Sequence, residues 1–392
     1  MMHVLTLTPF YPVEEDDAVG CFVAEPLPWL QRERIRSSVM AVRPAYRGRA
    51  HASPEALPAS LIHYWALPGN FGLPLSGAFL FARMLSQVRR LHETDPVDLI
   101  HAHGPLPCGH AAALISGELG IPFVVSVHGL DAYATKQVKG YAGRWCKRVS
   151  QMVYRSAQQV VCISEKVREQ VLLGGNGSVR ASVVYNGADP QSFHPTEAGE
   201  ERGSVVLSIG NLIPIKGHEI LIRAVAALRD RYPELRCELI GDGPERRNLR
   251  QLATRLGIED RVHFSGRQSR KNVAEALRRC TIFALPSSYE GLGCVYLEAM
   301  ASGKPVIAAR EQGIGEIIRD GENGLLVGAG EVQELTGALA RLLANPELRS
   351  AMGRAGRRTV VSGFTLAHQA HGLAQVFRQG VGRQSGRWQS EG

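Results

Sequence analysis

Two glutamates, Glu290 and Glu298, stand eight residues apart around a glycine pair, Gly291 and Gly293. The segment before them, 281–285, predicts a short buried strand, and the residues after Gly293 have helical apolar spacing. At a strand–glycine–helix junction the first helical N–H groups bind anions, and glycine lets a phosphate approach the backbone closely. Carboxylates accept hydrogen bonds from hydroxyl groups. The pattern therefore predicts a site for a sugar nucleotide, with Glu290 in the loop and Glu298 more than one turn into the helix.

Glutamates at this spacing are common, and alone they would indicate two solvated charges on a helix. The preceding strand, the glycines and the run Ala-Met-Ala-Ser-Gly-Lys-Pro-Val at 299–306 make the pattern specific. With these features the sequence closely resembles glycosyltransferase family 4 (group 1), from about residue 3 to about residue 375. The resemblance extends to bacterial transferases of cell-surface polysaccharide, exopolysaccharide and teichuronic-acid synthesis. It implies the GT-B fold and a retaining, metal-independent hexosyltransferase-type enzyme that uses a nucleotide-sugar donor.

The resemblance also assigns roles around the glutamates. Glu290 would hold hydroxyls of the donor sugar and Glu298 the ribose diol, since charge-assisted hydrogen bonds are the stronger class. The residues between them complete the donor loop: Gly291, Leu292 and Gly293. In this family the favoured mechanism is front-face attack, in which the departing phosphate itself takes the acceptor's proton.

A second candidate anion loop, residues 210–217, follows the first strand of the second half and opens a helix. A fixed ammonium at Lys216 could stabilise the charge that develops on a departing nucleoside diphosphate. The alternative is a solvated lysine, but a cation at a helix N-terminus is unfavourable without an anion. The family has arginine where this chain has Asn211, so one cationic contact is missing or comes from elsewhere. Gly210 joins Asn211 and Lys216 among the expected donor contacts.

Histidines carry the candidate chemistry of the first half. His128 ends a strand in His128-Gly-Leu-Asp131, and the resemblance places it against the donor sugar. The alternative is a satisfied core histidine. Asp131 would orient His128 or touch the acceptor. His101 and His103 share one strand face with His110 nearby, which leaves a metal pair open. There is no obvious third ligand and no Asp-x-Asp motif, so we expect no metal, and His103 near substrate.

Two further contacts follow from the resemblance alone. Gly20, after the first strand, would bring backbone N–H groups to the diphosphate or the acceptor, although the family often has two glycines there. Glu316 lies in a glycine-rich loop that touches the donor, and Gly315 replaces the usual proline. No cofactor is expected, because the nucleotide-sugar is a co-substrate. The implied catalytic residues are His128, Lys216 and Glu290.

The elements that must position these residues alternate along the chain. In the first half we expect strands at 3–8, 39–43, 98–101, 123–128, 160–163 and 182–185, and helices at 78–92, 109–119 and from 165. In the second half we expect strands at 204–209, 236–240, 262–265, 282–285 and 305–308, and helices at 217–231, 245–256, 272–279, 346–361 and 365–379. Near-continuous apolar strands separated by helices predict parallel sheets covered on both faces.

At 392 residues the α/β chain is long enough for two Rossmann-like domains, with ligands in a deep cleft at the carboxyl ends of their strands. We expect an acceptor-side domain over 1–188 and a linker without periodicity over 189–203. The nucleotide-sugar domain would span 204–362. A terminal helix, 363–379, would cross back to the first domain before a flexible tail, 380–392.

Composition limits the compartment and the partners. Seven scattered cysteines without a Cys-x-x-Cys pair indicate a reducing cytoplasm and neither a disulfide framework nor structural zinc. No apolar run approaches the ~18–20 residues that span a bilayer, and the N-terminus predicts a buried strand and not a signal peptide. The net charge of +8 suits nucleic acid, an anionic membrane or an anionic substrate equally.

The basic stretch 136–155 has aromatic residues among its cations and no acid. It contains Lys136, Lys139, Arg144, Lys147, Arg148 and Arg155. A solvated helix face explains it as well as a surface for anionic lipids, where each basic residue contributes ~1 kcal/mol. The second reading would place the protein on the inner face of the plasma membrane, where it would meet a glycan or lipid-linked acceptor.

Two other functions are compatible with parts of the sequence. A related GT-B sugar-nucleotide epimerase stays open, and a required acceptor would separate the two. A nucleic-acid-binding protein predicts a basic stripe with stacking aromatics or a reader motif. Aromatic residues make up only 6% of the chain and no such motif occurs, so we expect no nucleic-acid partner.

Overall fold

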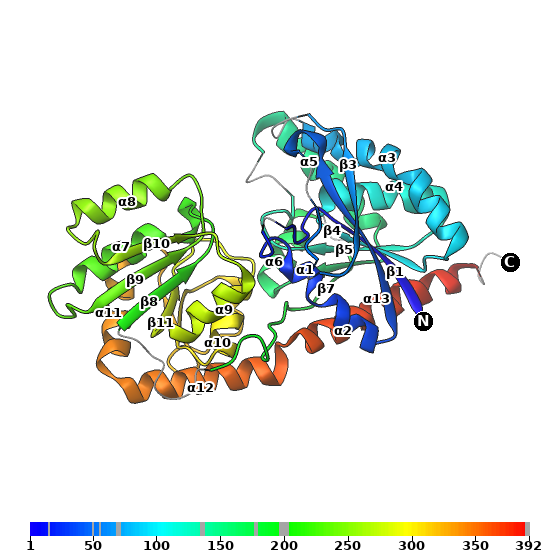
Figure 1. Cartoon of the computed structure of the whole chain (residues 1–392). Coiled ribbons are helices and arrows are strands. Elements are labelled where there is room, and N and C mark those ends of the chain that lie inside the picture. The colour runs from blue at the N-terminus through cyan, green and yellow to red at the C-terminus, as the bar shows by residue number, and fades with distance from the viewer. Residues whose placement is uncertain are drawn as a thin grey trace. The chain divides into compact units, whose positions relative to one another are not determined.

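The computed structural model describes residues 1–14, 16–48, 51–54, 56–67, 72–133, 138–175, 179–195 and 204–388, without the side chains of 383–388. Lys136 and residues 196–203 of the expected linker lie outside this description. The chain divides into two compact units, Met1–Tyr185 with Leu366–Gly392, and Asn186–Thr365. Each unit contains one parallel sheet with helices on its faces (Figure 1). The expected α/β class with two Rossmann-like domains is confirmed.

The first unit has a seven-stranded sheet of order β3-β2-β1-β4-β5-β6-β7. Its strands are β1 (Met2–Thr8), β2 (Ile35–Pro44), β3 (Ala59–Tyr64), β4 (Leu99–His103), β5 (Phe123–Val127), β6 (Gln159–Cys162) and β7 (Ala181–Val183). Its α-helices are α1 (Cys21–Ala24), α2 (Leu27–Arg32), α3 (Leu73–Thr94), α4 (His110–Leu119), α5 (Gly140–Ser156), α6 (Glu165–Gly174) and α13 (Leu366–Trp388). The strand order reverses between β1 and β4, and at such a switch point the carboxyl ends of the strands bind ligands.

Every residue of β4 and β5 is buried, as their near-continuous apolar sequences predict for strands covered on both faces. The terminal helix α13 belongs to this unit, and its Phe377 ring lies 4.9 Å from the His101 ring. The helix runs to Trp388, beyond the point where the flexible tail was expected to begin. A methyl group on Gly380 would lie only 3.3 Å from the Leu99 side chain, so the glycine lets the helix pack closely there. Residues 389–392 lie outside the described part.

The second unit has a six-stranded sheet of order β10-β9-β8-β11-β12-β13. Its strands are β8 (Ser204–Ile209), β9 (Leu235–Ile240), β10 (Val262–Gly266), β11 (Ile282–Leu285), β12 (Val306–Ala309) and β13 (Leu325–Val327). Its α-helices are α7 (His218–Ala227), α8 (Arg246–Arg255), α9 (Arg270–Arg279), α10 (Cys294–Ala301), α11 (Val332–Ala344) and α12 (Pro346–Gly363). The sequence did not predict β3, β13 or α11.

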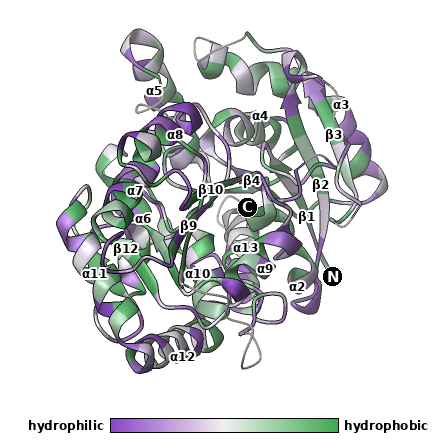
Figure 2. Ribbon diagram, turned by 60° about the vertical axis from the view of Figure 1, so that its left-hand side comes forward, coloured by the Kyte–Doolittle hydropathy of each residue, from purple (hydrophilic) through white to green (hydrophobic). Residues whose placement is uncertain are grey.

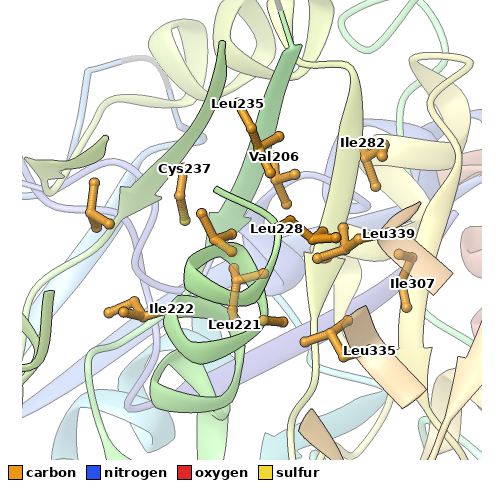
Figure 3. Close-up of a cluster of buried hydrophobic side chains, with 14 of the residues drawn as sticks. Val206, Leu221, Ile222, Leu228, Leu235, Cys237, Ile282, Ile307, Leu335 and Leu339 are labelled. Carbon is orange, nitrogen blue, oxygen red and sulfur yellow. The ribbon is translucent and has the colours of Figure 1, made fainter. Parts of the chain in front are cut away.

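One face of the second sheet packs against α7 and α11 (Figure 3). Leu221 of α7 and Leu335 of α11 are fully buried there, together with Val206 and Ile282 from the strands. Figure 2 shows hydrophobic and hydrophilic residues mixed along α11 and α12, as expected for helices that turn one face to a core. This core holds the sheet whose carboxyl edge carries the motif loops.

The chain enters and leaves the second unit at neighbouring points. The Ala188 N–H donates a hydrogen bond of 3.0 Å to the Phe364 carbonyl, and Ala188 forms a parallel bridge with Thr365.

Within the described residues, no helix is both long enough and apolar enough to cross a membrane.

Candidate active site

The glutamate loop of the second unit runs from the end of β11 to the start of α10. Gly293 caps α10 at a φ of 82°, in the left-handed region. A Cβ added there would lie 2.7 Å from the Tyr296 ring and 3.0 Å from Glu290 Cγ, so a side chain does not fit. The Tyr296 hydroxyl donates to the Leu285 carbonyl and fixes the helix to the strand. The predicted strand–glycine–helix junction is confirmed, and it leaves backbone N–H groups at the start of α10, which is the kind of position that can bind an anion.

Lys216 and Glu290 meet across two loops that are far apart in the sequence. Lys216 Nζ donates to Glu290 Oε2 at 2.5 Å, with the side chains 19% and 13% exposed. The loops approach closely because Gly217 has a φ of 71°, and a Cβ on it would lie 2.2 Å from the Pro286 carbonyl oxygen. The lysine stem passes over Gly210, where an added Cβ would lie 3.6 Å from Lys216 Cδ. The fold thus joins the cation and the first carboxylate that the sequence singled out.

A third loop holds the backbone of Glu290. Its N–H donates to Gln312 Oε1 at 2.9 Å, and its carbonyl accepts from the Gly313 N–H at 3.1 Å. Gln312 is buried and begins the turn Gly313–Glu316, whose last residue is exposed. Nothing in the sequence pattern pointed to Gln312. Its amide oxygen therefore holds the backbone of the glutamate loop at Glu290.

The second glutamate has a different cation. Arg270 Nη1 donates to Glu298 Oε1 at 2.8 Å, and the Glu298 side chain is only 5% exposed. The two carboxylates therefore pair with different cations, one in the loop and one on the helix. Sequence reasoning missed Arg270, although a cation at the first position of a helix was a readable signal.

The remaining donor-side residues differ in what they can offer a ligand. Gly291 and Leu292 are buried, Leu292 completely, so both belong to the packed interior of the loop. Asn211 and Glu316 are exposed at the ends of their loops.

In the first unit three imidazoles, His101, His103 and His128, form what we call the histidine cluster. The β4–β5 register places His103 opposite Ser126. His103 Nδ1 lies 3.0 Å from His128 Nε2, with the rings within 10° of parallel, and His101 Nε2 lies 2.7 Å from Ser126 Oγ. The Phe22 ring covers His128 at 4.7 Å. His128 Nδ1 is buried and has no hydrogen-bond partner among the described residues.

Burial keeps the histidine cluster neutral. It lowers the pKa of His101 and of His128 to about 3, and neighbouring imidazole charge adds to the effect at His101. Burial is the main cause that lowers the pKa of His103 well below its ordinary value, and charge on the other two rings is the smaller cause. His128 is therefore a neutral ring near pH 7, able to donate or accept one hydrogen bond at Nδ1.

Asp131 contacts His128 through the backbone N–H of that residue and not through its ring. Its Oδ1 accepts from the His128 backbone N–H at 2.9 Å, while the buried Oδ2 has no hydrogen-bond partner in the described part of the chain. Burial raises the pKa of this carboxyl to about 6, against backbone hydrogen bonds that lower it.

Gly20 is a close-approach glycine beside the same cluster. It has a φ of 71°, and an added Cβ would lie 2.3 Å from the Phe10 carbonyl carbon. The Phe10 ring in turn lies 5.9 Å from the His128 ring. Among the described residues, no three His, Cys, Asp or Glu side chains gather in a group that could hold a metal ion.

Comparisons with known proteins agree across both units. A model described as Glycosyltransferase Family 4 matches residues 7–192, and one described as Glycosyl transferases group 1 matches residues 191–359. An uncharacterised glycosyltransferase of Methanocaldococcus jannaschii is 32% identical over 69% of this chain and 72% of its own length. The lipopolysaccharide core biosynthesis glycosyltransferase LpsE of Rhizobium meliloti is 35% identical over 54% of this chain and 62% of its own.

A solved structure has a similar fold. The structure of HepE from Anabaena in complex with UDP-glucose superposes with a TM-score of 0.75 at 23% identity, covering 96% of this chain and 100% of HepE. With family models over both halves, the chain belongs to the group 1 (family 4) glycosyltransferases and has their GT-B fold.

Proposed function

We propose that this glycosyltransferase transfers a sugar, with retention of configuration, from a nucleotide-sugar to a glycan or lipid-linked acceptor in cell-surface polysaccharide synthesis. The observation that carries the proposal is the contact between Lys216 and Glu290 beside the start of α10. A cation suited to a diphosphate and a carboxylate suited to sugar hydroxyls lie 2.5 Å apart. The bond that breaks in a nucleotide-sugar joins these same two chemical groups.

In the proposed reaction the bond between the sugar's anomeric carbon and the β-phosphate oxygen breaks. Negative charge builds on that oxygen, and Lys216 with the N–H groups of the first turn of α10 stabilises it. The acceptor hydroxyl attacks the same face of the sugar, and its proton passes to the departing phosphate. Glu290 holds the sugar hydroxyls, and His128 donates or accepts one hydrogen bond at the donor sugar as a neutral ring. No metal or resident cofactor has a role in this proposal.

Two relatives support the substrate classes. LpsE carries a role in lipopolysaccharide core synthesis in its name, and the HepE structure contains UDP-glucose. The name of LpsE fits a surface glycan as product, and the HepE complex fits an activated sugar as donor.

A donor panel tests the proposal. Release of nucleoside diphosphate from UDP-, GDP- and ADP-sugars is measured with and without candidate lipid-linked acceptors. Glu290→Gln and Lys216→Ala should each lower turnover by about 10²–10³, the effect of removing one group that stabilises transition-state charge. The matched control is Glu219→Gln, which breaks the exposed 2.8 Å pair with Arg223 on α7. Unchanged turnover in Glu290→Gln, or a product of inverted anomeric configuration, would refute the assigned site or the retention.

We also propose that the protein works in the cytoplasm, on the inner face of the plasma membrane. Helix α5 supports this, because it carries basic residues and no acid beside exposed apolar side chains. Tyr141 is 75% and Trp145 41% exposed, and the Arg144 guanidinium lies 5.4 Å from the Tyr141 ring. Aromatic rings beside cations suit an anionic headgroup layer.

Co-sedimentation with vesicles checks this association. Phosphatidylglycerol vesicles should retain the protein, and pure phosphatidylcholine vesicles should not. The variant Arg144→Gln/Lys147→Gln/Arg148→Gln should lose the difference. Equal binding of the wild type to both kinds of vesicle would refute the proposed membrane association.

A further inference from the structure

Arg270 stands where a helix disfavours a cation. It is the first residue of α9, and the partial positive charge of a helix N-terminus makes that position unfavourable for arginine unless an anion compensates. The helix already has a cap, since Ser269 Oγ accepts from the Asn272 N–H at 3.3 Å. The compensating anion is Glu298 of α10, 2.8 Å from the guanidinium. The placement of Arg270 is therefore explained by its partner and not by helix formation.

The guanidinium is fixed on a second side by an aromatic ring. Its carbon lies 4.9 Å from the centre of the Phe193 ring, and Phe193 is buried. The backbone of Phe193 is itself held, because its N–H donates to the Asp189 carbonyl at 2.9 Å and its carbonyl accepts from Arg357 at 3.2 Å. Arginine is suited to this place, since a planar guanidinium stacks on a ring while it binds a carboxylate.

The segment that carries Phe193 also holds the start of α10. Asn186 Nδ2 donates to Cys294 Sγ at 3.3 Å, at the first residue of the helix. The helix is thus held at Cys294 directly and at Glu298 through Arg270. Residues 186–195 therefore hold α10 at two positions, Cys294 and Glu298.

The carboxylate that results has one oxygen engaged and one available. Glu298 Oε1 accepts from Arg270, whereas Oε2 has no hydrogen-bond partner among the described residues. The side chain is 5% exposed, and removal of the cation would leave an uncompensated buried charge, so the carboxylate depends on Arg270.

We propose that Arg270 is a positioning residue for the donor nucleoside: it holds Glu298 so that Oε2 accepts a hydrogen bond from a ribose hydroxyl. The inference rests on the proposed function, in which Glu298 binds the ribose diol. It adds that the affinity for the ribose depends on an arginine that does not itself touch the sugar.

Binding of nucleoside diphosphates to the full chain tests the inference. Isothermal titration gives dissociation constants for UDP, GDP and ADP and for their 2′-deoxy counterparts, and the best-bound base is used. In the wild type the 2′-deoxy form should bind roughly ten- to hundredfold more weakly, as expected for a charge-assisted hydrogen bond. In Arg270→Met this ratio should fall below about threefold, because Glu298 is no longer aligned. The matched control is Arg279→Met on the same helix, where Arg279 is 55% exposed and lies 3.9 Å from Glu275; its ratio should equal that of the wild type.

Two further variants separate the possible failures. Glu298→Gln should abolish the ratio as Arg270→Met does, and if it keeps the wild-type ratio, the donor site of the proposed function is wrong and this inference with it. If Glu298→Gln abolishes the ratio and Arg270→Met retains it, only the positioning role is overturned. If Arg270→Met shows no cooperative thermal unfolding, the same ratio is measured in Arg270→Lys, which keeps the charge and loses the planar guanidinium. A ratio for Arg270→Lys between those of the wild type and Glu298→Gln supports the inference, and a ratio equal to that of the wild type overturns it.

Discussion

The Lys216–Glu290 contact predicts that removing a proposed catalytic carboxylate tightens the binding of one ligand. In the free protein Glu290 lies 2.5 Å from the ammonium and neutralises the cation that we assign to the diphosphate. Glu290→Gln keeps the size of the side chain and removes its charge. A nucleoside diphosphate without a sugar has no hydroxyls for Glu290 to hold, and it would meet Lys216 without a competitor and without a nearby negative charge.

The magnitude follows from the geometry. Unit charges 4 Å apart interact by about 4 kcal/mol at an effective dielectric constant of about 20. The two side chains are 19% and 13% exposed, so water and neighbouring dipoles screen part of this energy. We expect a net gain of about 1.4 kcal/mol, which is a tenfold lower dissociation constant for the diphosphate. Turnover of the nucleotide-sugar should fall in the same variant by about 10²–10³.

Titration calorimetry with the diphosphate and a turnover assay with its sugar measure the two effects on one preparation. Lys216→Met should weaken the diphosphate and lower turnover, so the two variants differ in the sign of one measurement. Glu219→Gln, on the exposed pair of α7, should change neither. Weaker diphosphate binding in Glu290→Gln would mean that Glu290 does not compete for Lys216, and the assignment of charges in the site would be wrong.

Three other changes have expected outcomes. Gly293→Ala should lower the unfolding free energy by more than about 1 kcal/mol in chemical denaturation, because its φ is 82° and the added Cβ meets Tyr296 at 2.7 Å; unchanged stability would show that the loop can shift. Burial lowers the pKa of His128 in the folded state from 6.5 to about 3. The unfolded chain therefore binds a proton that the folded chain does not bind between these pH values, so the contribution of the neutral ring to the unfolding free energy is fully present above pH 6.5 and is lost as the pH falls toward 3. Unfolding free energies between about pH 8 and pH 4 should decline, and His128→Gln should reduce the slope by about one proton; an unaltered slope would contradict the lowered pKa. Asn211→Arg should add a cation at an exposed position of the Lys216 loop and tighten diphosphate binding by up to about tenfold in calorimetry, whereas no gain would place that loop position away from the phosphates.

The elements around the glutamates were predictable because local signals agree there. The strands 204–209 and 282–285 have the bounds expected from sequence, since each is an apolar run that ends at a glycine or a proline. The edge strand β3 gives a weaker signal, because only Ile62 and Tyr64 of its six residues are buried and Ser60 is exposed. Helix α11 was missed although Leu335, Leu339 and Leu342 have readable helical spacing.

The contacts of the site were less predictable than its residues. Lys216 and Glu290 were both selected from sequence, but their contact spans 74 residues and depends on the close approach of Gly217 to Pro286. Arg270 was not selected because its carboxylate lies on another helix, 28 residues away. Pairing between elements is set by how the sheet orders its strands, and a local pattern contains no information about that order.

The hydrogen bond between Ala188 and Phe364 makes the second unit, in effect, a cassette inserted between β7 and α13. Its two ends lie together, which is the arrangement that tolerates excision, transplantation and circular permutation. The boundary that matters for such work is Asn186 and not the first strand at Ser204, because residues 186–195 carry the side chains that hold α10 and Arg270. A fragment cut at Ser204 would keep the sheet and both glutamates and would lose the support of the helix that presents Glu298. Exchange of donor specificity between relatives should therefore move this segment together with the sheet.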